Sequence, residues 1–399
     1  MKNESVVYWA LPNEVVALKN TPKNMVTNNL IKTRLILEKI LDNIEPGDKV
    51  AIKVHVGEGY NTRYLRHDYV HEVVDFIKSK GGIPTLIETM GLGMKVQHIK
   101  MSEDYVICMN VRRTASEHEK IAQLHGYSEA TIGAPLKFID GEKGIDGKII
   151  KIDGIHFKDV SVGKGLFDFD KMVVISHFKG HGQAGYGGAL KQLGIGCVTK
   201  RNKFRAHFDG IQMNPKKCEG SDCDKICLEV CPVDAIKYNS DTLMIDDALC
   251  VGCLACSDYC KVKRAISSNW RNVPDFVERL IDNATGVING FGSENIRYIN
   301  FAFDVVLNCD CAPNPGPAII PDLGIFGSKD PVAVDKACVD AETAAPGVPR
   351  MDKDGNWIDP LGPGIEKFHA LMPLSDTSYQ LNAAFKNKIG YLNYKLIKI

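Results

Sequence analysis

Eight of the thirteen cysteines of the chain lie between Cys218 and Cys260, and their spacing constrains this segment more than any other feature of the sequence. In its second half, two, two and three residues separate successive cysteines, which is the spacing of iron–sulfur ligands. In its first half the intervals are four, three and three residues. Longer loops still close around a cluster, because closure entropy grows slowly with loop length. The segment therefore predicts two [4Fe–4S] clusters.

The order of the cysteines predicts which four hold each cluster. In proteins with two such clusters, the last cysteine of each run ligates the other cluster. Disulfides are the first alternative, and they are disfavoured because the sequence shows no secretory signal. Zinc is the second alternative, and eight ligands at these intervals fit two zinc sites poorly. The first cysteine set is then Cys218, Cys223, Cys227 and Cys260, and the second cysteine set is Cys231, Cys250, Cys253 and Cys256.

Residues 215–268 resemble a bacterial two-[4Fe–4S] ferredoxin domain. Besides the cysteine spacing, the segment repeats internally: Cys231-Pro-Val-Asp-Ala-Ile is echoed by Cys260-Lys-Val-Lys-Arg-Ala-Ile. The resemblance implies a small α+β domain inserted between two larger parts of the chain. We therefore expect a first α/β part at residues 1–214 and a second at residues 269–399.

Length and charge limit the classes of partner. A chain of 399 residues exceeds the ~250 to 300 at which one core stops growing, so more than one domain is expected. Its 49 basic and 49 acidic residues give no net charge, which argues against binding nucleic acid or anionic membranes. No apolar run is long enough to cross a membrane. We expect a cytoplasmic protein whose partners are a small-molecule substrate and a redox protein such as a ferredoxin.

Helix and strand patterns alternate on both sides of the cysteine-rich segment. Apolar residues recur at helical spacing in residues 25–44 and 67–80, and residues 49–56 and 83–88 have the composition of strands. This alternation predicts an α/β fold, with a mainly parallel sheet and helices on both faces. Other expected strands are 6–9, 169–176, 296–308, 322–326 and 391–397, and other expected helices are 115–126, 273–283 and 376–388, with one beginning within 327–331.

A glycine-rich stretch follows the expected strand at residues 169–176. It contains Gly185, Gly187 and Gly188 among titratable side chains. Ligands of open α/β sheets bind at the carboxyl ends of strands, and glycines let the backbone approach a ligand closely. A helix starting near Gly187 would also direct free N–H groups at an anion. The alternative is a flexible turn with exposed histidines. The candidate catalytic residues of this stretch are His181, Lys191 and His207, and the candidate cofactor-binding residues are Gly185, Gly187, Gly188 and Lys191.

Two family resemblances rest on this stretch. The His-Phe-Lys-Gly-His and Gly-Gly-Ala-Leu-Lys-Gln-Leu-Gly segments, the inserted cysteine-rich unit and a later Ser-Lys-Asp-Pro-Val-Ala-Val-Asp segment resemble the DUF362 family of iron–sulfur proteins. The loop ending at Lys191 is more distantly similar to that of lactate racemases, which carry a nickel-pincer nucleotide on a lysine. That likeness implies attachment at Lys191, acid/base catalysis by His181 and metal ligation by His207. This chain has Leu190 where that family has arginine.

Three further segments are conspicuous. Lys200 to Arg205 carries four positive charges, which suit either an anion site or a solvated face. Cys309 and Cys311 follow an expected strand and suit a soft-metal or redox pair, or two ordinary buried thiols. Residues 344–364 are rich in proline and glycine, and their length suggests a lid or binding loop.

The leading hypothesis from the sequence is an iron–sulfur oxidoreductase. Two clusters would pass electrons to a small anionic substrate in a pocket formed by glycines, His181, Lys191 and His207. A histidine that titrates near neutrality would supply the proton, and Lys191 would hold the anion. The alternatives are a racemase or epimerase of 2-hydroxy acids with a Lys-linked or additional metal cofactor, and a non-catalytic electron-transfer protein.

Overall fold

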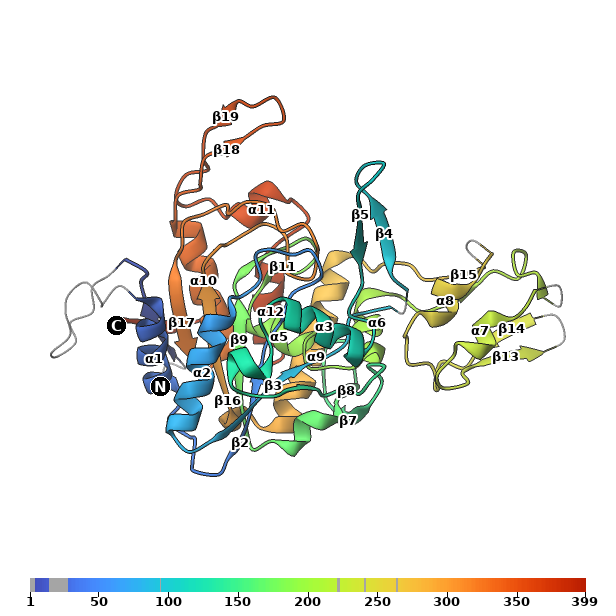
Figure 1. The fold of residues 1–399 in the computed structure, drawn as a ribbon, viewed down its shortest axis with the longest axis horizontal. Helices are drawn as coiled ribbons and strands as arrows, with labels where there is room; N and C mark the ends of the chain where they lie inside the picture. The colour runs from blue at the N-terminus through green and yellow to red at the C-terminus, as the bar shows by residue number, and fades with distance from the viewer. Residues whose placement is uncertain (1–3, 14–27, 94, 221–222, 240–241, 263–264) are drawn as a thin grey trace.

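Eight strands build one sheet through the body of the protein (Figure 1). The computed structural model describes residues 4–13, 28–93, 95–220, 223–239, 242–262 and 265–399. The strands are β1 (Ser5–Ala10), β2 (Lys49–Lys53), β3 (Ile83–Glu88), β6 (Leu136–Phe138), β9 (Lys171–His177), β16 (Ile296–Ala302), β17 (Gly324–Ser328) and β20 (Tyr394–Lys398).

The order of strands across the sheet is β20-β1-β17-β16-β9-β2-β3-β6. Strand β17 runs antiparallel to both of its neighbours, and every other neighbouring pair is parallel. Strands from both sides of the cysteine-rich segment take part, so the flanking parts of the chain share one sheet. The expected α/β class with a mainly parallel sheet is confirmed. The parallel strands β2, β3, β9 and β16 bring their carboxyl ends to one edge.

Helices cover both faces of the sheet and form two separate cores. Strand β9 shows why, because successive side chains of a strand point to opposite faces. Its Val173 and Ile175 join one core, and its Met172 and Val174 join the other. The first core includes side chains of α1 (Asn29–Ile40) and α2 (His67–Ser79), and the second includes side chains of α5 (Ala189–Gly194), α9 (Val273–Phe291), α10 (Pro331–Ala344) and α12 (Ser378–Lys386).

The cysteine-rich segment forms a small module that projects from the body (Figure 1). The chain enters the module through β12 (Gln212–Met213) and leaves it through β15 (Ile266–Ser267). These two strands pair antiparallel where the module joins the body. Its own small core contains Cys227, Ile236 and Cys256. The other elements of the module are α7 (Ile226–Glu229), α8 (Ala255–Tyr259), β13 (Ile236–Asn239) and β14 (Thr242–Ile245).

Short elements complete the fold. Hairpins are formed by β4 with β5, β7 with β8, β10 with β11 and β18 with β19, and two 3₁₀ turns lie at Lys164–Asp168 and Ser293–Asn295. The bounds are β4 (Gln97–Lys100), β5 (Val106–Met109), β7 (Gly147–Lys151), β8 (Asp159–Gly163), β10 (Lys179–His181), β11 (Gly185–Gly187), β18 (Arg350–Met351), β19 (Trp357–Ile358), α3 (Ala115–Leu124), α4 (Glu129–Ile132), α6 (Lys200–His207) and α11 (Lys367–Leu371).

Two expectations about local structure need correction. Strand β16 ends at Ala302, so Cys309 and Cys311 lie on a turn and not at a strand end. The loop expected at residues 344–364 contains the β18–β19 hairpin, which stands away from the body (Figure 1). Residues 25–27 of the first expected helix lie outside the described residues.

Asp282 of α9 is fully buried and holds neighbouring segments together. Its carboxylate accepts the backbone N–H groups of residues 155–157 at 2.6–2.8 Å and the Asn387 Nδ2 amide at 2.8 Å. An amide in its place presents N–H groups to these donors. We expect Asp282→Asn to lower the free energy of unfolding by about 2–3 kcal/mol, measured by urea denaturation. Asp153→Asn, at an exposed position, is the matched control; equal stability of the two variants would contradict this role.

Candidate functional site

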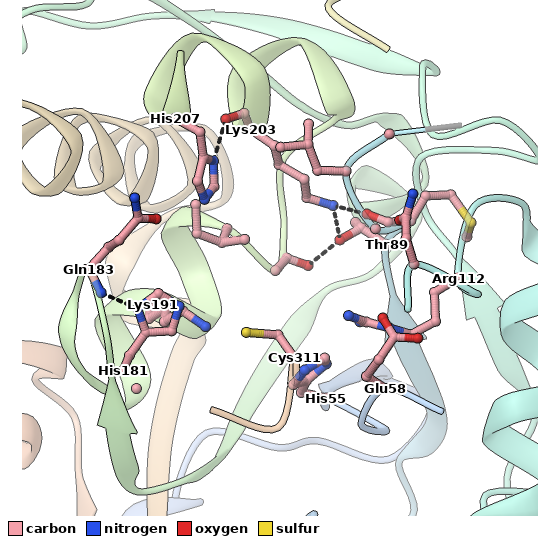
Figure 2. Close-up of a pocket in the computed structure, with 18 of the residues that line it drawn as sticks. His55, Glu58, Thr89, Arg112, His181, Gln183, Lys191, Lys203, His207 and Cys311 are labelled. Carbon is pink, nitrogen blue, oxygen red and sulfur yellow. Dashed lines mark hydrogen bonds and ion pairs between the residues drawn. The ribbon is translucent and has the colours of Figure 1, made fainter. Parts of the chain in front are cut away.

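A cavity of about 410 Å³ lies at the edge of the sheet where β2, β3 and β9 end. Figure 2 shows its side chains facing a common space, with His207 and Lys203 of α6 opposite His55 and Cys311. This is the edge at which open α/β sheets bind ligands. Of the residues predicted from the sequence, His181, Gly187, Gly188, Lys191 and His207 line the cavity.

Gly185 is not among the described residues that line the cavity. Its φ of +78° is a left-handed conformation, and an added Cβ would lie 2.7 Å from the Asp376 carbonyl oxygen. Gly185 therefore allows close packing of the chain on itself. Gly188 similarly faces a protein group, because its added Cβ would lie 2.5 Å from Asp335 Oδ1.

The N-terminus of α5 is occupied by a carboxylate of the chain itself. Asp335 accepts the N–H groups of Ala189 at 2.8 Å and Leu190 at 3.0 Å, and its Oδ1 accepts Asn300 Nδ2 at 2.7 Å. The expectation that this helix start binds an external anion is therefore wrong. Burial raises the pKa of Asp335 to about 6, although the bonds from α5 lower it.

Lys191 is paired with a cysteine. Its Nζ donates to Cys309 Sγ at 3.1 Å. Burial opposes charge on both groups, yet the attraction between them raises the pKa of Lys191 and, with a hydrogen bond from Cys311, lowers that of Cys309 well below its ordinary value. The contact therefore favours an ammonium on Lys191 and a thiolate on Cys309. Lys191 was expected to hold a substrate anion, and the structure gives it an anion of the chain.

The two predicted histidines have opposite tautomers, each set by the backbone. His181 Nδ1 accepts the N–H groups of Gln183 at 3.2 Å and Ala184 at 2.9 Å, so its proton is on Nε2. His207 Nδ1 bonds to the Lys203 carbonyl oxygen at 2.7 Å, so its proton is on Nδ1 and Nε2 is an acceptor. The cavity thus has one imidazole donor and one imidazole acceptor.

Neither histidine titrates near neutrality, which corrects the sequence-based expectation. Burial, and then the charge of Lys191, lowers the pKa of His181 to about 3. Burial lowers the pKa of His207 to about 4, although its bond to the backbone of Lys203 raises it. Both rings are therefore neutral at pH 7.

A third histidine of the cavity was missed from the sequence. His55 follows β2, and its Nδ1 lies 3.1 Å from Glu88 Oε2 at the end of β3. Glu88 Oε1 also accepts Lys53 Nζ at 2.8 Å. Burial would raise the pKa of Glu88, but Lys53 and His55 lower it well below its ordinary range. The carboxylate therefore holds the His55 proton on Nδ1.

The remaining nitrogen of His55 is a free acceptor. Nε2 is buried and has no hydrogen-bond partner among the described residues, and His55 lines the cavity. A carboxylate–histidine pair with a free nitrogen is a common arrangement for a general base. The alternation of Lys53 and His55 with apolar residues at a strand end was the sequence signal for this group.

The cations of the cavity differ in what they face. Lys179 Nζ lies 2.9 Å from Asp310, and Arg112 Nε lies 3.1 Å from Glu58. Lys203 Nζ instead donates to two neutral acceptors, Thr89 Oγ1 at 2.8 Å and the Met90 carbonyl oxygen. The basic run at residues 200–205 is therefore not simply a solvated face.

Lys203 is the cation best placed to attract an anion. It is buried, and burial lowers its pKa to about 8 against the attraction of Asp140, which raises it. Its charge is therefore present at neutral pH and lost in mildly alkaline solution.

Each expected cysteine set surrounds its own hollow in the projecting module. Cys218, Cys223, Cys227 and Cys260 line one hollow. The second hollow is lined by Cys231, Cys250, Cys253 and Cys256. None of the described cysteines is in a disulfide. Each hollow is therefore lined by the four cysteines of one predicted set.

Backbone amides point at the sulfurs in both sets. The Lys225 N–H donates to Cys223 Sγ at 3.4 Å, the Ala235 N–H to Cys231 Sγ at 3.3 Å, and the Gly252 N–H to Cys250 Sγ at 3.4 Å. Such bonds stabilise thiolates and tune cluster potentials.

The second cysteine set lies beside the cavity. Leu254, which follows Cys253, lines both the cavity and the hollow of this set. Gly252 packs so closely on α6 that an added Cβ would lie 2.4 Å from Phe204 Cβ. The helix that carries Lys203 and His207 into the cavity therefore also contacts the loop of the second cysteine set.

Comparison with known families covers most of the chain. The sequence profile of the family described as "Domain of unknown function (DUF362)" matches residues 50–340. A ferredoxin of Alicyclobacillus acidocaldarius is 36% identical over 55 residues, 13% of this chain and 70% of the ferredoxin. A 7Fe ferredoxin of Hydrogenibacillus schlegelii is 46% identical over 39 residues, 10% of this chain and 50% of that protein.

Other similarities are shorter or weaker. Hydrogenase-4 component A of Escherichia coli is 38% identical over 47 residues, 12% of this chain and only 23% of that protein. The lactate racemase apoprotein of Thermoanaerobacterium thermosaccharolyticum has a TM-score of 0.38 at 11% identity, with 100% of this chain and 84% of that chain aligned. A Thermotoga maritima protein has a TM-score of 0.35 at 12% identity, and the alignment covers 68% of this chain and 50% of that chain.

Within the described residues, every helix is too short or too polar to span a bilayer.

The neutral histidines make stability depend on pH. Their folded pKa values, about 3 for His181 and about 4 for His207, lie below the unfolded value of about 6.5. The unfolded chain therefore binds more protons below pH 6.5, and stability falls as the pH falls. We expect each histidine to account for about 2 kcal/mol lost between pH 7 and pH 5, measured by anaerobic urea denaturation.

Glutamine variants test this linkage. His181→Gln and His207→Gln should each lose less stability than the wild type over this pH interval. His98→Gln, at an exposed position, is the control and should lose as much as the wild type. A pH dependence shared by all of these proteins would contradict the neutral, buried state of the two rings.

Proposed function

The chain belongs to the DUF362 family. We propose that it is an iron–sulfur oxidoreductase that delivers electrons to a small anionic substrate in the cavity at the sheet edge. The observation that carries the proposal is the shared wall: Leu254 borders both the cavity and the second cysteine set. An electron-transfer module and a ligand-sized cavity are thus in direct contact.

Two [4Fe–4S] clusters are the cofactors that we propose. Four cysteines line each hollow, backbone N–H groups are directed at sulfurs of both sets, and partial similarity to ferredoxins supports the assignment. When bound, each cluster carries one electron at a time. A ferredoxin-like redox protein is the proposed external partner, and residues 215–268 are the proposed extent of the module.

The cavity has the groups that a proton-coupled reaction needs. His55 Nε2 and His207 Nε2 are unprotonated acceptors, and the Nε2–H of His181 is a donor. We assign a proton relay to His55, because Glu88 stabilises the imidazolium that forms when Nε2 takes up a proton before passing it to the reduced substrate. His181, neutral at pH 7, stabilises developing negative charge by hydrogen bonding.

The Lys-linked cofactor of the racemase alternative remains a prediction. The Lys191 Nζ that would carry it is engaged by Cys309. The intact mass of the purified chain tests it, since an unmodified Lys191 in active protein excludes this alternative.

Metal analysis tests the two cysteine sets. Anaerobically purified protein should contain about eight irons per chain, four for each cluster. Cys227→Ala and Cys256→Ala each remove one ligand, from the first and the second set respectively, and each should lower the iron content by about half. Cys108→Ala, outside both sets, should leave it unchanged. Iron near zero, or about two zincs per chain, would end the proposal.

The anion site of Lys203 gives the cavity a pH dependence. Because its pKa is about 8, protonation and affinity decline together as the pH rises. We expect binding of pyruvate, measured by calorimetry, to weaken about tenfold per pH unit above pH 8.

Substitution of Lys203 should give the same loss at constant pH. Lys203→Gln should weaken pyruvate binding about tenfold or more at pH 7, whereas Lys143→Gln, at an exposed site, should not. Iron content checks that each variant is folded. Unchanged affinity in Lys203→Gln at normal iron content would refute the anion site.

A further inference from the structure

Cys309, Asp310 and Cys311 form a tight turn at the cavity wall. The Ala312 N–H donates to the Cys309 carbonyl oxygen at 2.9 Å, which closes the turn. The two sulfurs and a ring nitrogen of His181 all lie within 4.8 Å of one another. Cys311 lines the cavity, whereas Cys309 is buried at 3% exposure. The turn therefore presents one sulfur to a ligand and holds the other beside it, out of solvent.

The central residue of the turn fixes it to the sheet. Asp310 is fully buried and accepts His177 Nδ1 at 3.0 Å and Lys179 Nζ at 2.9 Å. Its carbonyl oxygen accepts the Glu58 N–H at 2.8 Å. Because its charge is neutralised by these partners, Asp310 does not prevent a negative charge on the neighbouring sulfur.

Three groups around Cys309 favour its thiolate form. Lys191 Nζ donates to Cys309 Sγ at 3.1 Å, and the Cys311 N–H donates at 3.3 Å. The Cys311 thiol also hydrogen-bonds to Cys309, which lowers the pKa of Cys309 and raises that of Cys311 well above its ordinary value. The two cysteines therefore share one proton, which resides on Cys311.

Two thiols and an imidazole also suggest zinc, which often binds such a set. His181 argues against it. A neutral imidazole binds a metal through its unprotonated nitrogen, and that nitrogen of His181 already accepts the N–H groups of Gln183 and Ala184. The nitrogen left over carries a proton. Lys191 moreover supplies the positive charge that stabilises the thiolate.

We propose that Cys309 and Cys311 are a redox-active dithiol, and that the cavity admits small disulfides, which the dithiol reduces. The inference rests on the proposed function only for the source of its electrons. Cys311 is the sulfur that meets the substrate, because it lines the cavity. Cys309 is the resolving sulfur, because it is buried and its Sγ lies within 4.8 Å of Cys311 Sγ.

The exchange balances in two steps. Cys309 takes the proton of Cys311 as Cys311 attacks the substrate disulfide, which releases one substrate thiolate and leaves a mixed disulfide. Cys309 Sγ then attacks Cys311 Sγ and displaces the second substrate thiolate. The proton of Cys309 passes to this thiolate. With one proton from solvent, the products are two substrate thiols and a Cys309–Cys311 disulfide.

Restoring the resting state takes two electrons and one proton. This yields the Cys309 thiolate and the Cys311 thiol. The two cysteine sets would hold the one-electron iron–sulfur centres of the proposed function, and together these would supply the two electrons that one disulfide needs.

Peptide mass spectrometry tests the inference on the intact, iron-loaded protein. Tyr298–Lys329 is a tryptic peptide whose only cysteines are Cys309 and Cys311. Holoprotein is equilibrated anaerobically with mixtures of reduced and oxidised dithiothreitol, quenched in acid, alkylated and digested. We expect the peptide to convert from doubly alkylated to unalkylated and internally disulfide-bonded, without loss of iron. A peptide that stays doubly alkylated both in fully oxidised dithiothreitol and in excess oxidised glutathione, a linear disulfide, would overturn the inference. So would one zinc per chain that is absent from Cys311→Ala.

Variants of Lys191 test the origin of the thiolate. Loss of the ammonium destabilises the reduced form, so Lys191→Gln should reach half conversion at about a tenfold lower ratio of oxidised to reduced dithiothreitol. Lys191→Arg, which retains the charge, should restore the wild-type ratio, and Lys143→Gln should not shift it. An identical ratio in Lys191→Gln and the wild type would overturn the role of Lys191.

The inference and the proposed function fail separately. Normal iron content with an inert peptide would refute the dithiol alone. Conversion of the peptide to its disulfide form in protein that binds no iron would refute the proposed function alone.

Discussion

Lys191 Nζ lies 3.1 Å from Cys309 Sγ at the edge of the sheet, and this contact is one of several in which a buried charge requires an opposite charge. Burying an unpaired ion costs several kcal/mol, and a partner with good geometry offsets that cost. Lys53 with Glu88 and Lys179 with Asp310 follow the same rule. Because parallel strands end at one edge, these pairs are brought together there, and they set the protonation states on which the chemistry of the cavity depends.

Helix α6, which lines the cavity, also contacts the inserted module. Helix α6 carries Lys203 and His207 into the cavity, and its Phe204 packs against Gly252 in the loop of the second cysteine set. A displacement of this helix would alter the cysteine-rich module and the cavity together. Proximity of the two sites is therefore a consequence of this packing.

The sequence predicts much of this architecture and less of the site. The strands β2, β3 and β9 were predictable because their patterns are strongly apolar. The grouping of eight cysteines about two hollows was predictable from their spacing. Tertiary contacts decided the rest. Asp335, distant in sequence, fills the N-terminus of α5, and the partner of Lys191 is Cys309. The pKa values of His181 and His207 depend on burial and on backbone partners, neither of which a residue pattern specifies.

The central claim is that electrons held in the projecting module reach the cavity wall. Electron paramagnetic resonance of the reduced holoprotein measures this directly, because reduced [4Fe–4S] clusters are paramagnetic. After removal of excess reductant, oxidised dithiothreitol should abolish the cluster signals in the wild type and leave them in Cys311→Ala. Equal loss of signal in both proteins, or no loss in the wild type, would contradict the account.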